Sequence, residues 1–255
     1  ANGDFVMFVD PDDWIDSDLL EKLYEGQKTG DYDLVATMKS NATCDENGEI
    51  LSFSPQHYKE REIIGKEFLR NEFLEMMKNG VIGAPTNKLY KMSIIKEHGV
   101  DFPPLRRSQD IVFNYRYYNC IDSIKFLSYS GYNYRIELTN TIGRTKPDYY
   151  KTILFMYNDF QELYKSWGRQ FPDNEICNFF FKVRLNTNLQ RCVSKGWDIR
   201  SIVEEPTIHH IIEASSPNKI TLKFLRFLLL GKHYRLIKFY LSIITQIKLK
   251  GLVKK

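Results

Sequence analysis

The chain has 255 residues, of which 43% are hydrophobic and 14% aromatic, with 36 basic and 32 acidic residues and a formal net charge of +4. This composition excludes an intrinsically disordered, collagen-like or disulfide-dense chain, and it suffices for a buried core. The four cysteines are far apart, with no C-x-x-C pair and no nearby histidine cluster. They are expected to be reduced thiols of a cytosolic chain.

The charge is unevenly distributed along the chain. The last acidic residue is Glu213, so the first 213 residues hold 26 basic and 32 acidic residues, a net charge of −6. The remainder carries +10, from Lys219, Lys223, Arg226, Lys232, Arg235, Lys238, Lys248, Lys250, Lys254 and Lys255. A strand-like run begins within four residues of Ala1, without a lead-in, and we therefore expect a fragment of a longer protein.

Strands alternate with helices up to about residue 140. The first strand, 5–9, is a continuous apolar run, typical of a parallel strand buried on both faces. Further strands are predicted at 33–38, 87–90, 124–127 and 132–136, with a type I′ hairpin turn at Asn47-Gly48. Helices are predicted near 19–30 (capped by Asp16 or Ser17), 66–79, 93–99 (capped by Ser93) and from Gln109 onward (capped by Ser108).

From about residue 147 the periodicity is helical, with predicted helices at 149–167, 174–195 and 199–214. Two basic amphipathic helices follow, separated at Gly231. Because alternating strands and helices indicate an α/β domain, we expect a mixed sheet flanked by helices, followed by a C-terminal helical region.

A tight turn after the first strand carries Asp10, Asp12 and Asp13. Ligands of open α/β sheets bind beyond the carboxyl ends of the strands, where these residues are expected to lie. Several neighbouring carboxylates repel one another unless a cation is present, and Mg²⁺ or Mn²⁺ prefers such oxygen ligands. The alternative is a solvated turn whose acids favour the start of the next helix.

Four motifs, in order, resemble family-two glycosyltransferases, which have a GT-A fold. They are the D-x-D-D-W segment at 1–15, N-K-L-Y at 87–90, F-P at 102–103 with Q-D-I-V-F at 109–113, and Y-N-Y-R at 132–135 with Asn140-Thr141. The resemblance covers about residues 1–145. It implies a partial GT-A domain at 1–145, and the helical periodicity and charge pattern beyond it predict a helical extension at 146–217 and basic amphipathic helices at 218–255.

The resemblance also implies residue roles. Asp10 would contact the ribose or uracil side of a nucleotide sugar, a UDP-sugar, and Asp12 would bind the Mg²⁺ or Mn²⁺ that bridges its diphosphate. Asp110 would be the general base that activates the acceptor hydroxyl for an inverting attack. The donor or acceptor vicinity would include Asp13, Trp14, Asn87, Lys88, Gln109 and Arg135. The acceptor would be a saccharide or lipid-linked saccharide of a surface polysaccharide.

Two departures from the family pattern stand out. The family usually has Glu where this chain has Gln109, which affects a secondary contact because Asp110 is kept. The family domain also begins with two further strands that hold the nucleotide base, and none precedes Ala1. The resemblance therefore implies an N-terminally truncated chain that lacks most of the nucleotide pocket.

The basic tail has two interpretations. Basic amphipathic helices bind the interface of anionic membranes, which predicts a cytoplasmic protein held peripherally at the inner face of the cell membrane. Alternatively, the apolar faces pack on the domain and the lysines are solvated. The longest uncharged run, 239–247, is too short to span a bilayer. Basic and aromatic residues are not interleaved as nucleic-acid binding would require.

Other chemistries have weaker support. A haloacid-dehalogenase-like phosphatase also places D-x-D after an apolar strand, but it expects Gly-Thr where this chain has Asp13-Trp14. A non-catalytic membrane-surface module is the remaining alternative. His209 and His210 are adjacent, so their side chains diverge on a helix, which favours packing over metal binding.

Overall fold

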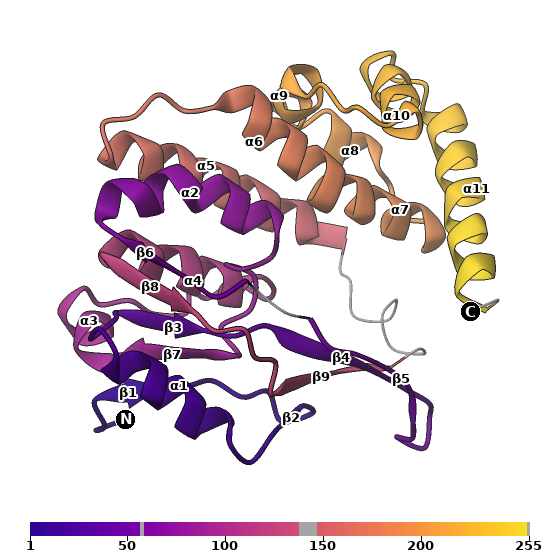
Figure 1. The fold of residues 1–255 in the computed structure, drawn as a ribbon. Coiled ribbons are helices and arrows are strands. Elements are labelled where there is room, and N and C mark those ends of the chain that lie inside the picture. The colour runs from indigo at the N-terminus through magenta and orange to yellow at the C-terminus, as the bar shows by residue number, and fades with distance from the viewer. Residues whose placement is uncertain (57–58, 138–146, 254–255) are drawn as a thin grey trace. The chain divides into compact units, whose positions relative to one another are not determined.

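The computed structural model describes residues 1–56, 59–137 and 147–253, and the chain divides into two compact units, residues 1–141 and 142–255 (Figure 1). The described part of the first unit contains two β-sheets with helices, and that of the second contains helices. The predicted α/β class with a C-terminal helical region is thus confirmed.

The larger sheet of the first unit has five strands. Their order is β1 (Phe5–Val6), β7 (Lys88–Lys91), β3 (Leu34–Ala36), β8 (Ser123–Phe126) and β6 (Arg61–Ile64). The central strand β3 pairs antiparallel with β7 and parallel with β8. All three of its residues are fully buried, which explains its unbroken Leu-Val-Ala sequence.

The smaller sheet has four strands in the order β2 (Trp14–Ile15), β9 (Tyr132–Glu137), β4 (Lys39–Cys44) and β5 (Ile50–Ser54). The predicted hairpin joins β4 to β5, but its turn is not type I′, because Gly48 has a positive φ of 85° and Asn47 does not. Instead, Asp45 accepts hydrogen bonds from the backbone N–H groups of Asn47 and Glu49, at 2.9 and 2.8 Å.

The first strand differs from the prediction. It pairs antiparallel with β7, through Phe5 with Lys91 and Val6 with Tyr90, and its residues are half-buried. The reason is its place at the edge of the sheet, where a strand has one neighbour. Beyond β1, Phe8 forms an isolated parallel bridge with Thr86.

The first unit also contains α1 (Leu19–Lys28), α2 (Lys66–Lys78), α3 (Met92–Glu97) and α4 (Gln109–Cys120). Their positions agree with the prediction, but the predicted caps of α1 and α3 are wrong. The N-cap of α1 is Asp18 and that of α3 is Lys91. Ser108 does precede α4, but with φ of 61° and no side-chain cap hydrogen bond.

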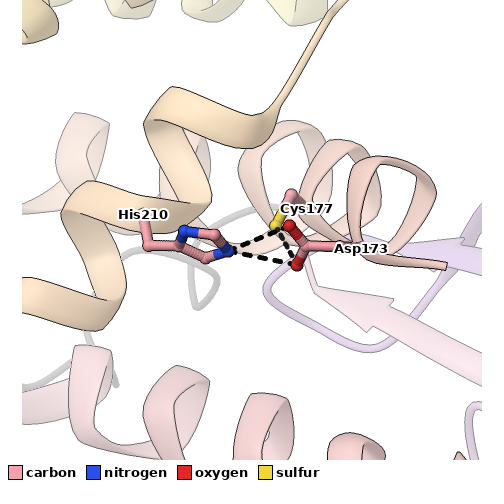
Figure 2. A group of neighbouring side chains, drawn as sticks. All are labelled: Asp173, Cys177 and His210. Atoms are coloured by element: carbon pink, nitrogen blue, oxygen red, sulfur yellow. Dashed lines mark hydrogen bonds and ion pairs between the residues drawn. The ribbon is translucent and has the colours of Figure 1, made fainter. Parts of the chain in front are cut away.

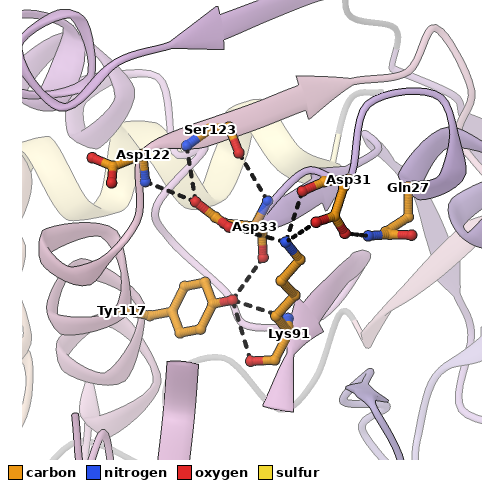
Figure 3. Close-up of polar contacts among 7 residues, drawn as sticks. All are labelled: Gln27, Asp31, Asp33, Lys91, Tyr117, Asp122 and Ser123. Atoms are coloured by element: carbon orange, nitrogen blue, oxygen red, sulfur yellow. Dashed lines mark hydrogen bonds and ion pairs between the residues drawn. The ribbon is translucent and has the colours of Figure 1, made fainter. Parts of the chain in front are cut away.

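Asp33, just before the central strand β3, links the ends of several elements of the first unit (Figure 3). Its carboxylate accepts hydrogen bonds from the backbone N–H groups of Asp122 and Ser123, at 2.8 and 3.1 Å, and pairs with Lys91 Nζ at 3.3 Å. The Tyr117 hydroxyl of α4 donates to the Asp33 carbonyl at 2.6 Å. These bonds fix the starts of β3 and β8 relative to β7 and α4.

The second unit begins with a 3-10 turn (Pro147–Tyr149) and α5 (Tyr150–Ser166). The predicted helix at 174–195 is α6 (Asp173–Phe179), a π-helical segment (Phe180–Leu185) and α7 (Asn186–Ser194). The predicted helix at 199–214 is two helices, α8 (Arg200–Val203) and α9 (Pro206–Ala214). Pro206 cannot continue a helix but suits its first turn, and Glu205 caps α9 by accepting from Ile208 N at 2.8 Å.

The basic segment forms α10 (Ile220–Leu230) and α11 (Tyr234–Val253), separated at Gly231. A stripe of apolar side chains on these helices is buried, comprising Leu222, Leu225, Leu228, Leu229, Ile237 and Leu241. Among the described residues, no helix is long and apolar enough to cross a membrane.

Candidate active site

Four aromatic rings in the first unit connect three of the motifs singled out in the sequence. Phe8 lies edge-on to Tyr90, Phe102 and Phe113, with ring centroids 5.6, 5.3 and 5.2 Å apart. Phe102 stacks on Phe113 at 4.4 Å. Because Phe8, Tyr90 and Phe113 each lie two or three residues from a candidate site residue, this aromatic cluster brings the acidic turn, the N-K-L-Y strand and the start of α4 together.

The acidic turn places three carboxylates in one small volume. Carboxylate oxygens of Asp10, Asp12 and Asp13 all lie within 4.8 Å of one another. Asp10 and Asp12 are exposed, and Asp13 is half-buried. No described residue donates a hydrogen bond to the Asp12 carboxylate, which leaves its oxygens available to a ligand.

Tyr132 of β9 anchors this turn. Its fully buried side chain places the hydroxyl where it accepts from Asp10 N at 3.1 Å and donates to Asp13 Oδ2 at 2.7 Å. The other oxygen of Asp13 accepts from Arg135 N at 2.8 Å. Asp13 is therefore held by β9 through both of its oxygens, whereas no described residue donates a hydrogen bond to the Asp10 or Asp12 carboxylate.

Asp110 is brought toward the acidic turn by Phe113, which lies three residues after it and packs against Phe8, two residues before Asp10. Desolvation by the surrounding protein, and then the charges of Asp13, Asp12 and Asp110, raise the pKa of the Asp10 carboxyl. Asp110 is half-buried near the start of α4, far from Asp10 in the sequence. The two segments thus converge, as the sequence resemblance requires.

Lys39 is a charged neighbour that the sequence analysis did not identify. Burial lowers the pKa of its ammonium, while the charges of Asp13, Asp10 and Asp110 oppose that shift. Its Nζ lies 3.9 Å from the centre of the Tyr134 ring. The rule that ligands bind beyond the carboxyl ends of strands could have found Lys39, because it follows β3 closely.

Asn87 and Lys88 lie beside the same turn. Asn87 has a left-handed φ of 56°. Its side-chain amide donates to the backbone carbonyl of Thr37, and its backbone carbonyl accepts from Thr37 N at 3.0 Å. The Lys88 ammonium is fully buried and donates to the Ala84 carbonyl at 2.8 Å. Burial, and then the nearby charge of Lys39, lower the pKa of Lys88 to about 7.

The remaining predicted residues surround this region less closely. The Arg135 guanidinium lies 5.8 Å from the Trp14 ring centre, and its Nε is buried without an acceptor among the described residues. Gln109 is exposed at the start of α4. Asn140 and Thr141, the last part of the fourth motif, lie outside the described residues.

The donor set suits a hard divalent cation. Three carboxylates supply only oxygen ligands, and their spacing allows one ion to contact oxygens of Asp10, Asp12 and Asp13. Desolvation raises the pKa of Asp10, and the negative charge of the neighbouring carboxylates raises it further. A cation would remove that repulsion.

Comparison with known families is consistent with this geometry. The profile of Glycosyl transferase family 2 matches residues 1–99. Residues 1–99 therefore belong to glycosyl transferase family 2. The matched segment contains the acidic turn and the N-K-L-Y strand, and it ends before Asp110.

A curated relative of this chain is a Bacillus subtilis (strain 168) protein named as the glycosyltransferase EpsH. It is 26% identical over 162 residues, which cover 62% of this chain and 44% of EpsH. The chain thus spans under half the length of that relative.

Solved structures of S. aureus TarS resemble this chain in fold. TarS 1–349 is 17% identical, covers 96% of this chain and 68% of its own chain, and superposes with a TM-score of 0.57. Its complex with UDP-GlcNAc gives a TM-score of 0.60, with coverage of 96% and 69%. At this level of identity the likeness establishes the GT-A fold.

The lowered pKa of Lys88 predicts a pH-dependent stability. Between about pH 7 and its ordinary pKa of 10.5, Lys88 binds fewer protons in the folded than in the unfolded state, so the free energy of unfolding should rise with pH across that window. Relative to Lys88→Met, the wild type should gain at least about 1 kcal/mol from pH 7 to 10, measured by urea denaturation. Lys22→Met, at a half-buried surface lysine, is the control, and parallel pH curves for wild type and Lys88→Met would refute the assignment.

Proposed function

We propose that this chain is the catalytic part of a metal-dependent, inverting glycosyltransferase. It would move a sugar from a nucleotide-diphosphate donor, a UDP-sugar, to a saccharide hydroxyl in surface polysaccharide biosynthesis. Family membership of residues 1–99 supports the class of reaction. The UDP-GlcNAc and UDP complexes of TarS support the choice of donor.

Binding of the donor is assigned to the acidic turn. Asp12, whose oxygens have no other partner among the described residues, would hold the Mg²⁺ or Mn²⁺ against the diphosphate, and Asp10 would contact the ribose or uracil. A bound divalent cation supplies Lewis-acid stabilisation of the charge on the leaving diphosphate. Lys39 would add a positive charge next to the same carboxylates.

Asp110 would act as the general base. Its carboxylate takes the proton of the acceptor hydroxyl as the hydroxyl oxygen attacks the anomeric carbon. The bond between that carbon and the diphosphate oxygen breaks, and the nucleoside diphosphate leaves with the electron pair. A single displacement from the opposite side inverts the anomeric configuration.

The observation that carries this proposal is the convergence of the acidic turn and the start of α4, which are distant in sequence but joined by the contact between Phe8 and Phe113. The charge of Asp110 acts on both Asp10 and Lys39. General base and donor-binding carboxylates must lie close together for this reaction, and a haloacid-dehalogenase-like phosphatase would not need an acid at position 110. The glycosyltransferase proposal therefore accounts for more of the site.

Asp110→Asn should lower the rate of sugar transfer about 10²- to 10⁴-fold, because a positioned general base contributes that much. The measurement is UDP release from UDP-sugars in the presence of Mg²⁺ and saccharide acceptors. Donor binding should change little, since Asn keeps the size of the side chain.

The matched control is Asp101→Asn, which removes an exposed carboxylate from the loop before α4. It should leave the rate unchanged. Equal rates for Asp110→Asn and the wild type would show that Asp110 is not the base.

Peripheral contact with an anionic membrane through residues 218–255 is a further part of the proposal. One apolar stripe of α10 and α11 is buried, but a second is exposed, comprising Ile220, Phe224, Phe227, Leu236, Phe239, Ile243 and Ile247. Phe227 and Phe239 are 64% and 67% exposed. Lysine side chains flank these aromatics, an arrangement typical of helices that lie in a membrane interface.

The buried stripe packs within the second unit, where α10 contacts α9 and α11 contacts α7. Membrane contact would use the other face of α10 and α11, so the two are compatible. The chemistry of the exposed face, apolar rings beside positive charge, matches a bilayer with acidic headgroups. The proposed location is the cytoplasmic face of the cell membrane, where saccharide or lipid-linked saccharide acceptors would be reached.

Phe227→Ser with Phe239→Ser should weaken binding to vesicles containing phosphatidylglycerol at least about tenfold, because each buried aromatic ring contributes about 1.5–3 kcal/mol. Co-sedimentation measures the effect. Phe53→Ser, at an exposed phenylalanine of β5, is the control. If the wild-type chain does not co-sediment with these anionic vesicles, the proposal is contradicted.

A further inference from the structure

Outside the candidate active site, a carboxylate, a thiol and an imidazole meet in the second unit (Figure 2). Asp173 and Cys177 lie on α6, four residues apart and so on one face, and His210 lies on α9. One ligand atom from each residue lies within 4.8 Å of the other two. No histidine cluster lies near a cysteine in the sequence, and packing was the interpretation favoured for His210, because this contact joins residues distant in the chain.

The separations suit one tetrahedral ion. His210 Nε2 lies 3.0 Å from Asp173 Oδ2 and 3.1 Å from Oδ1, and Cys177 Sγ lies 3.4 Å from Asp173 Oδ1. In a tetrahedral zinc site, the ordinary bond lengths separate a nitrogen from an oxygen ligand by about 3.3 Å and a sulfur from an oxygen ligand by about 3.6 Å. The two separations from Asp173 are therefore close to those of a zinc site, and the Cys177 sulfur and the His210 nitrogen lie within 4.8 Å of each other.

The surroundings support the same conclusion. The Tyr157 hydroxyl donates to Asp173 Oδ1 at 2.6 Å, and such an outer contact orients a ligating carboxylate. Cys177 is fully buried, whereas the His210 and Asp173 side chains are 48% and 39% exposed. An open pocket lined by Tyr157, Thr207 and His210 reaches the histidine. An ion can thus enter from solvent and meet a sheltered sulfur.

We propose that Asp173, Cys177 and His210 bind a Zn²⁺ ion that ties α6 to α9, with water in the fourth position. Thiolate and imidazole ligands select zinc over magnesium, so this site is chemically distinct from the all-oxygen acidic turn. The Cys177 thiol loses its proton to solvent on binding, because the thiolate is the ligand.

An ordinary ion pair between Asp173 and His210 is the competing explanation of the contact. That pair would need no sulfur, and its strength would not depend on Cys177. Cobalt(II) separates the two explanations, since a thiolate-to-cobalt charge-transfer absorption appears only when Cys177 is a ligand.

The experiment titrates Co²⁺ and then Zn²⁺ into the full chain after chelator treatment, in excess Mg²⁺ to occupy oxygen sites. The wild type should give the charge-transfer band with one Co²⁺ per chain, and Zn²⁺ should displace it. Cys177→Ser should abolish the band. His210→Gln should weaken Co²⁺ binding at least about tenfold, because even the loss of outer-shell partners costs about 10- to 100-fold.

Cys192→Ser and His209→Gln are the matched controls, at a buried free cysteine and at the neighbouring histidine. Both should bind Co²⁺ as the wild type does, and circular dichroism checks that every variant is folded. Absence of the band in the folded wild type, or an unchanged band in Cys177→Ser, would overturn the zinc site.

Discussion

The aromatic cluster of Phe8, Tyr90, Phe102 and Phe113 is the contact on which the candidate active site depends. Its members are buried or half-buried apart from Phe102, and the rings meet edge-on or stacked at centroid distances of 4.4–5.6 Å. Such pairs prefer defined geometries, so they fix orientation as well as proximity. The cluster thereby holds the strand before the acidic turn against the N-K-L-Y strand and α4.

Close packing of these segments creates an electrostatic cost. Asp10 is surrounded by Asp12, Asp13 and Asp110, which raise its pKa together with desolvation. Lys39 offsets part of the repulsion, while Lys88 is buried against carbonyl oxygens and has a pKa lowered to about 7. Perturbed pKa values of this kind cluster at functional sites. A cation and an anionic donor would satisfy both sets of charges.

Much of the fold was predictable from local pattern. The apolar periodicity of α1 and α2, the Ser108 cap of α4 and the strand pattern of β3 located those elements correctly. Local pattern was weaker at boundaries: the predicted caps of α1 and α3 were wrong by one or two residues. The break at Pro206 was visible in the sequence, but the π-helical segment of residues 180–185 was not, because it depends on tertiary packing.

The site was predictable to the extent that motifs carry it. The acidic turn and Asp110 follow from the motifs, whereas Lys39 has no motif of its own. His210 approaches Asp173 and Cys177 only because α6 packs against α9, and no spacing in the chain predicts such a contact. Long-range packing thus decides which ordinary residues join a site.

The central claim is that the aromatic cluster assembles one divalent-cation site at the acidic turn. Electron paramagnetic resonance of Mn²⁺ added to the full chain tests it most directly. If the acidic turn is the cation site, one Mn²⁺ binds per chain, Mg²⁺ displaces it, and Asp12→Asn abolishes the binding. Absence of Mg²⁺-displaceable Mn²⁺ binding, or equal binding in Asp12→Asn, would contradict it.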